Sequence, residues 1–115
     1  MRWINMFRHP PDLIDLSVGE VQQATLDGTA TLVDVRTAGE FSRGHINGAI
    51  WHPMGSGIEW LQRIPQGSTV ILICKTGHRS QAVAADVLQQ GRGPVAHLKG
   101  GMDAWKRARA PIVTG

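Results

Sequence analysis

The chain has 115 residues, of which 42% are hydrophobic, and a net charge of +3. Its length predicts a single domain over 1–115, whose core spans 13–109 between an N-terminal extension over 1–12 and a C-terminal tail over 110–115. A single cysteine excludes disulfides within the chain, and no segment approaches the ~18 apolar residues of a membrane span, so we expect a cytoplasmic protein. The scattered cations lack the interleaved aromatics of a nucleic-acid surface, so nucleic-acid binding is not expected.

Strand and helix patterns alternate along the whole chain. In chain order, the predicted elements are a strand at 14–16, a helix from 17 to about 26, a strand at 31–35, a short helix from 37, a strand at 49–52, a short helix at 58–63, a strand at 69–73, a helix at 80–90, a strand at 95–98 and a last helix ending near 108. Two helix starts carry the capping-box pattern, Ser17 with Glu20 and Thr37 with Glu40. This alternation predicts an α/β fold with a mainly parallel sheet, in which ligands bind at the carboxyl ends of the strands.

Cys74 is the strongest candidate for chemistry. It ends the aliphatic run at 70–73 and precedes a loop and a helix predicted to begin at Ser80. A thiol at a helix N-terminus, with Lys75 and Arg79 in the same loop, is in surroundings that favour the nucleophilic thiolate. The simpler alternative is a small buried core residue, but such a residue needs neither the two cations nor the helix behind it.

The histidines give no sign of a metal site, because neither they nor the single cysteine show metal-ligand spacing; they are His9, His45, His52, His78 and His97. No cofactor is expected either. A Cys–His hydrolase would need a base aimed at the thiol, and His78 is expected at the rim of the loop. Asp34 and Arg36 lie at the end of the second strand, and we favour a buried structural pair with Glu40 over a direct contribution to the potential at the site.

Several short motifs occur in one order along the chain. They are Asp34-Val35-Arg36, Glu40-Phe41, Gly44-His45-Ile46 with Gly48-Ala49, the loop from Cys74 to Ser80, and Leu98-Lys99-Gly100-Gly101 with Trp105. Together they resemble a single rhodanese domain from about Leu16 to Trp105. The resemblance implies a three-layer fold, with a central mainly parallel sheet flanked by helices on both faces. It also implies sulfur transfer from a donor such as thiosulfate, through a persulfide on Cys74, to a thiol acceptor such as a thioredoxin-like protein.

The loop that follows Cys74 suits this chemistry, and its residues Lys75, Thr76, Gly77, His78, Arg79 and Ser80 form the predicted substrate-binding loop. Its backbone N–H groups can stabilise a sulfur anion, Gly77 allows the sharp curve, and Ser80 or Thr76 can add a hydroxyl donor. Lys75 and Arg79 can attract the sulfonate of thiosulfate. The family pattern places Gly100 and Gly101 beside the loop, and we expect the thiol in a surface pocket.

Two other classes of function remain as alternatives. A phosphatase or arsenate reductase on a related fold uses Cys-x5-Arg, whereas Cys74 and Arg79 are separated by four residues, a loop length suited to one sulfur atom rather than a phosphoryl group. A persulfide carrier or binding module without turnover is the other alternative, although a binding module usually lacks the cysteine. The apolar segment from Trp3 to Phe7 is a candidate contact for the domain or a partner.

Overall fold

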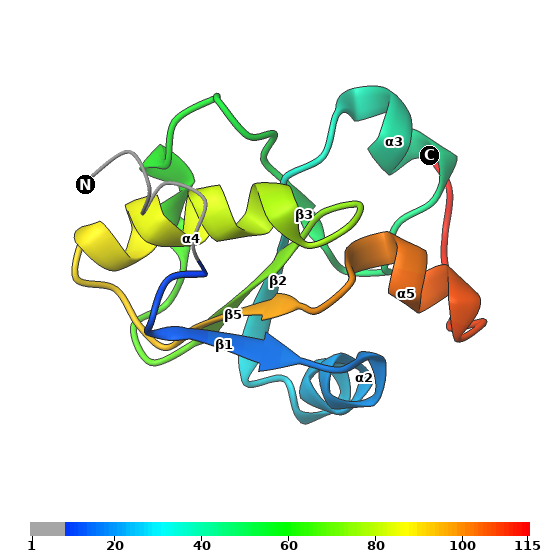
Figure 1. Ribbon diagram of the computed structural model, residues 1–115, viewed down its shortest axis with the longest axis horizontal. Coiled ribbons are helices and arrows are strands. Elements are labelled where there is room, and N and C mark those ends of the chain that lie inside the picture. The colour runs from blue at the N-terminus through cyan, green and yellow to red at the C-terminus, as the bar shows by residue number, and fades with distance from the viewer. Residues whose placement is uncertain (1–8) are drawn as a thin grey trace.

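The computed structural model describes residues 9–115 (Figure 1). Five strands form one sheet in the order β1-β5-β4-β2-β3, and every neighbouring pair is parallel. The strands are β1 Leu13–Leu16, β2 Ala30–Asp34, β3 Ile50–Trp51, β4 Thr69–Ile73 and β5 Val95–Leu98. The predicted contact segment from Trp3 to Phe7, and most of the predicted extension, lie outside the described residues.

The helices follow the predicted order. They are α2 Val18–Asp27, α3 Ala38–Arg43, the 3-10 helix η1 Glu59–Arg63, α4 His78–Gln89 and α5 Gly101–Arg107. Both predicted capping boxes are confirmed, at Ser17 with Glu20 and at Thr37 with Glu40. Within residues 9–115, none of the helices is long and apolar enough to cross a membrane.

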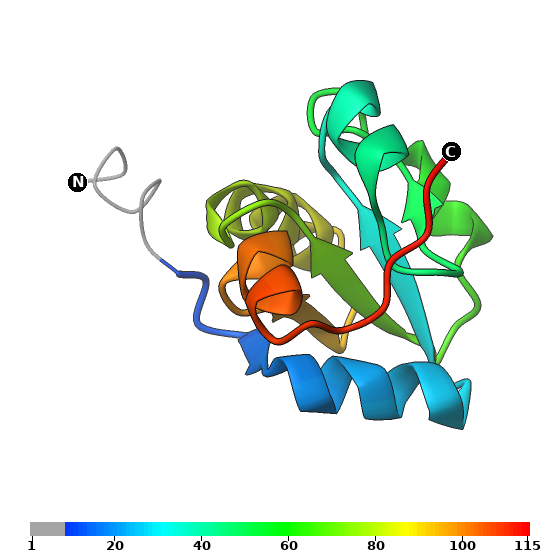
Figure 2. The same ribbon diagram turned by 90° about the vertical axis from the view of Figure 1, so that its right-hand side faces the viewer.

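Helices cover both faces of the sheet, which confirms the predicted three-layer α/β fold (Figure 2). One buried cluster joins the sheet to α4 and η1, and the other joins it to α2 and α5. β4 supplies both clusters, because alternate side chains of a strand point to opposite faces. Val70 and Leu72 pack on the α4 side, whereas Ile71 and Ile73 pack on the side of α2 and α5.

The start of α4 differs from the prediction. The helix begins at His78 with Gly77 as its N-cap, two residues before the predicted start at Ser80. Ser80 does not cap the helix, since its side chain is buried and its hydroxyl donates to the carbonyl of Gly77. This shift brings the loop that follows Cys74 into a tighter turn than the sequence suggested.

Candidate active site

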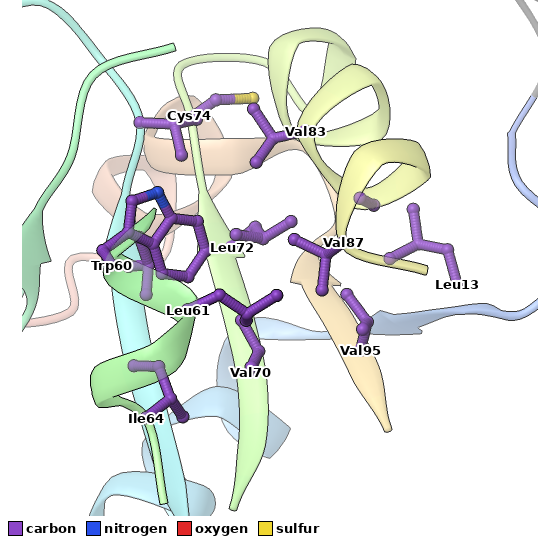
Figure 3. Close-up of a cluster of buried hydrophobic side chains, with 13 residues drawn as sticks. Leu13, Trp60, Leu61, Ile64, Val70, Leu72, Cys74, Val83, Val87 and Val95 are labelled. Carbon is purple, nitrogen blue, oxygen red and sulfur yellow. The ribbon is translucent and has the colours of Figure 1, made fainter. Parts of the chain in front are cut away.

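Cys74 directly follows β4, at the carboxyl end of the parallel sheet. The side-chain alternation that places Leu72 toward α4 places Cys74 on the same face. Figure 3 shows the thiol beside Val83, at one end of the cluster that also contains Trp60. Cys74 has no exposed surface, so the predicted surface pocket is wrong. Val83 of α4 lies beside the thiol and helps to enclose it.

The loop backbone directs one N–H group at the sulfur. Gly77 donates to Cys74 Sγ at 2.9 Å, a contact that favours negative charge on the sulfur. Gly77 has a φ of 101°, which residues with a Cβ rarely adopt. A Cβ there would also lie 3.4 Å from the backbone nitrogen of Gly100, which places Gly100 beside the loop.

The first turn of α5 supports the same loop from its other side. The N–H groups of Met102 and Asp103 donate to the carbonyls of Cys74 and Lys75 at 2.8 and 3.0 Å. This close approach depends on Gly101, where a Cβ would lie 2.5 Å from the carbonyl oxygen of Cys74 and 2.5 Å from the carbonyl group of Lys75. The start of α5 therefore fixes the path of the backbone around the thiol.

The Ser80 hydroxyl lies between the thiol and a buried histidine of β5. Cys74 donates to Ser80 Oγ at 3.4 Å, and Ser80 Oγ lies 2.7 Å from His97 Nδ1. His97 Nε2 lies 2.7 Å from Oδ1 of Asp15, its register partner in β1. Burial lowers the pKa of His97, while the hydrogen bond to the Asp15 carboxylate acts in the opposite direction. A continuous chain of hydrogen bonds thus connects Cys74 with Asp15.

Arg79 is bound by a carboxylate that the sequence did not assign to it. Its Nη1 and Nη2 donate to Oε1 and Oε2 of Glu40 at 2.8 and 2.9 Å. The backbone N–H and the hydroxyl of Thr37 donate to the same carboxylate at the start of α3. The hydrogen bonds from Arg79 hold the pKa of Glu40 well below its usual range. Because Glu40 compensates its charge, Arg79 attracts a substrate anion less strongly than the sequence alone suggested.

Asp34 and Arg36 form the predicted buried pair. The Asp34 carboxylate accepts hydrogen bonds from Arg36 Nε and Nη2 at 2.9 and 2.7 Å, and both side chains are buried. Arg36 Nη2 also donates to the carbonyl of Gly44 at 2.9 Å, which ties the end of β2 to the end of α3. Glu40, which was predicted to join the pair, binds Arg79 instead.

The remaining polar side chains of the loop lie at its exposed rim. Lys75 Nζ donates to Asp103 Oδ2 at 3.1 Å, and both side chains are exposed. Thr76 Oγ1 lies 3.0 Å from His78 Nδ1, so His78 occupies its predicted place at the rim. The hydroxyl that reaches the sulfur is that of Ser80, not that of Thr76.

Three acidic or imidazole partners were missed by sequence reasoning: Asp15, His97 and Asp103. The position of His97 within the apolar strand at 95–98 indicates a buried hydrogen bond, because a buried imidazole needs a hydrogen-bond partner. The identity of that partner depends on the pairing of β1 with β5, which local patterns do not reveal. Asp103 carried no local signal beyond its position in the first turn of the last helix.

We expect the ion pair of Glu40 and Arg79 to contribute stability that acid removes. Because the folded-state pKa of Glu40 lies below its ordinary value of 4.5, this contribution is present above about pH 4.5 and is lost as the pH falls further. Glu40→Gln should lower the free energy of unfolding at neutral pH by about 1.5–3 kcal/mol, and by less at pH 3. Urea unfolding at the two pH values measures both effects.

Glu20→Gln is the matched control, since Glu20 holds the same capping-box position in α2 and bonds Ser17. Its effect should stay within about 0.5 kcal/mol at both pH values. Equal losses of stability in the two variants would contradict a contribution from Arg79.

The chain is similar to known proteins over most of its length. A family model described as "Rhodanese-like domain" matches residues 17–108. The chain is 40% identical over 82 residues to a sulfurtransferase of Allochromatium vinosum, covering 71% of this chain and 77% of that protein. It is 30% identical over 95 residues to the thiosulfate sulfurtransferase GlpE of Shewanella oneidensis, covering 83% of this chain and 94% of that protein. A crystal structure of a thiosulfate sulfurtransferase from Pseudomonas aeruginosa matches with a TM-score of 0.75 and 29% identity, covering 90% of this chain and 20% of that one.

Proposed function

This chain belongs to the rhodanese family, whose sulfurtransferase members support a general sulfurtransferase role, and on that premise we propose that it transfers sulfur from thiosulfate through a persulfide on Cys74. The observation that carries the proposal is the position of the thiol. Cys74 lies at the carboxyl end of the sheet, within 2.9 Å of the Gly77 N–H group, which can stabilise a sulfur anion.

In the first step of the proposed reaction, the Cys74 thiolate attacks the outer sulfur of thiosulfate. The sulfur–sulfur bond of the donor breaks, sulfite leaves with the bonding electron pair, and Cys74 becomes a persulfide. In the second step, a nucleophilic acceptor attacks the outer sulfur of the persulfide and the Cys74 thiolate is restored. The protein ends each cycle as the same Cys74 thiolate with which it began. Each step exchanges one bond to the transferred sulfur for another, so no redox cofactor is required.

The chain contributes positioning and charge stabilisation to both steps. The Gly77 N–H and the Ser80 hydroxyl lie 2.9 and 3.4 Å from Cys74 Sγ, where they can stabilise the thiolate that attacks in the first step and leaves in the second. The start of α5 keeps this geometry through its hydrogen bonds to the carbonyls of Cys74 and Lys75. Preorganised donors of this kind reduce the reorganisation that the reaction requires.

A donor reaches the thiol only after a local movement, because Cys74 has no exposed surface. A cleft of about 340 Å³ lies next to the cluster that encloses the thiol, and Trp60 and Val83 belong to both. A shift of either side chain would open the thiol toward this cleft. His52 and Met54, on the segment after β3, line the same cleft and would contact an acceptor that entered there.

The acceptor in this proposal is a thiol, and a thioredoxin-like protein fits because it presents a nucleophilic thiolate to a persulfide. A cytoplasmic location is part of the same proposal, since such thiols stay reduced there. The phosphatase alternative has less support. Both terminal nitrogens of Arg79 donate hydrogen bonds to Glu40, and these are the groups that would bind the phosphoryl oxygens.

Steady-state assays separate the alternatives. With thiosulfate as donor and cyanide as a test acceptor, the proposal predicts sulfite and thiocyanate in equal amounts over many turnovers. One equivalent of sulfite without continued turnover would identify a carrier instead. Hydrolysis of an aryl phosphate, with no product from thiosulfate, would favour a phosphatase and contradict the proposal.

Lys75 is the loop cation that we expect to attract thiosulfate. Its ammonium group is exposed and has one exposed carboxylate partner, Asp103. Lys75→Ala should raise the KM for thiosulfate about two- to fivefold at low salt, the size expected of one screened charge. The difference should shrink as ionic strength increases.

Asp103→Asn is a control with the opposite expected effect on the KM, because it leaves the charge of Lys75 without its carboxylate partner. This variant should lower the KM for thiosulfate at low salt. If neither variant changes the KM, the backbone N–H groups hold the anion and Lys75 has no part in binding.

A further inference from the structure

We propose that His97 is a positioning residue that receives the proton of Cys74 through the Ser80 hydroxyl, with Asp15 stabilising the resulting imidazolium. The proposal rests on Cys74 acting as a nucleophile, because only then does the thiolate have to form. It adds to that role a route for the proton, which a fully buried thiol cannot give directly to water.

The four groups form one chain from the end of β4 to β1. Cys74 Sγ lies 3.4 Å from Ser80 Oγ, Ser80 Oγ lies 2.7 Å from His97 Nδ1, and His97 Nε2 lies 2.7 Å from Asp15 Oδ1. Ser80 and His97 are both buried, and each of their polar side-chain atoms makes a contact within this hydrogen-bond chain. Asp15 and His97 face each other because β1 and β5 pair in register at these residues.

The hydrogen-bond chain has two proton arrangements that keep its three links, and in both the Ser80 proton points along the chain and away from the Gly77 carbonyl, whose oxygen lies 3.1 Å from Ser80 Oγ. In the first, the Cys74 thiol donates to Ser80 Oγ, the Ser80 hydroxyl donates to His97 Nδ1, and His97 Nε2 donates to Asp15. In the second, the Ser80 hydroxyl donates to the Cys74 thiolate, and an imidazolium at His97 donates to both Ser80 and Asp15. Conversion moves the thiol proton to Ser80 and the original Ser80 proton to His97, so protons balance and Ser80 is unchanged.

Asp15 is the group that makes the second arrangement accessible. Burial disfavours an imidazolium at His97, and the carboxylate of Asp15 offsets this. His9 Nε2 also lies 2.6 Å from Asp15 Oδ1, and His9 Nδ1 lies 2.8 Å from the carbonyl oxygen of Pro10. The hydrogen bond from His9 lowers the pKa of Asp15, which keeps the carboxylate ionised. The charges of His9 and Lys99 both oppose an imidazolium at His97.

The charged groups around the sulfur partly cancel. Arg79 interacts favourably with a Cys74 thiolate, and Arg79 is itself paired with Glu40. Asp34 interacts with the same guanidinium and is paired with Arg36. Because these nearby charges are paired, they should not mask the effect of His97. A proton acceptor that is linked to the thiol by hydrogen bonds should measurably change the pH at which the thiolate forms.

The ultraviolet absorbance of the thiolate tests the proposal, because Cys74 is the only cysteine in the chain. Absorbance is followed against pH in wild type, His97→Gln, Ser80→Ala and the double variant, each corrected with its matching Cys74→Ser protein. His97→Gln should raise the midpoint of thiolate formation by about one pH unit, the size expected of one hydrogen bond to a charged group. Adding His97→Gln to Ser80→Ala should cause no further shift, since His97 acts through Ser80.

Two further variants make the result decisive. Asp15→Asn, at a site where the side chain is 40% exposed, should raise the midpoint by a smaller amount and serves if His97→Gln fails to fold. His45→Gln replaces another buried histidine, which bonds the Phe41 carbonyl, and should leave the midpoint unchanged.

An unchanged midpoint in His97→Gln, or in Asp15→Asn where His97→Gln does not fold, would overturn the proposal. So would equal shifts by His97→Gln in the presence and absence of Ser80. The titration uses no sulfur donor, so it can fail while sulfur transfer is observed, or succeed while transfer is absent.

Discussion

Replacing Cys74 with serine is expected to reduce thiosulfate-dependent sulfur transfer to background, a loss of about a thousandfold or more, because no other thiol is present to carry the sulfur. The fold should persist. A serine hydroxyl can accept the Gly77 N–H bond and stay within reach of the Ser80 hydroxyl. Transfer is measured as thiocyanate formation, and circular dichroism and thermal unfolding report the fold.

Cys74→Ala is the companion variant, and the burial of the thiol changes what it should do. Because Cys74 lies within a core cluster, removing its sulfur leaves a small cavity and an unpaired Gly77 N–H group. We expect a loss of about 1–3 kcal/mol in the free energy of unfolding, together with loss of transfer. Transfer above background in folded Cys74→Ser would show that Cys74 is not the sulfur carrier.

Gly101→Ala is expected to disrupt the site without touching the thiol. The new Cβ would lie 2.5 Å from backbone atoms of Cys74 and Lys75, at a φ of 59°. Backbone atoms cannot move aside as a flexible side chain can, so the loop or α5 must shift. We expect a loss of about 2–4 kcal/mol in stability, from left-handed strain and overpacking together, and at least about a tenfold loss of sulfur transfer.

Gly28→Ala separates the two causes, because Gly28 has a similar φ of 70° but no heavy atom within 4 Å of an added Cβ. It should lose only the ~1 kcal/mol of left-handed strain and keep full activity. If Gly101→Ala behaves like Gly28→Ala in stability and in activity, the close approach of α5 is not what positions the loop.

The parts of the fold that depend on neighbouring residues could be predicted from the sequence. The capping boxes at Ser17 and Thr37 use partners three residues away, and both are present. The aliphatic run before Cys74 predicted a buried strand and placed the thiol at its carboxyl end. The family resemblance extended this to the three-layer fold, and the matching family model confirms the family.

The parts of the site that depend on distant partners could not be predicted in the same way. Arg79 binds Glu40, 39 residues away, and the sequence suggested an interaction between Glu40 and the nearer Arg36 instead. His97 binds Asp15, 82 residues away, through a strand pairing that no local pattern specifies. The burial of Cys74 depends on how α4 and η1 pack over the strand end, and thus on tertiary contacts.

The mass of the intact protein after incubation with thiosulfate tests the central claim most directly. The account predicts that wild type gains the mass of one sulfur atom, that a reductant or cyanide removes it, and that Cys74→Ser gains nothing under the same conditions. No gain in wild type, or an equal gain in Cys74→Ser, would contradict a persulfide on Cys74.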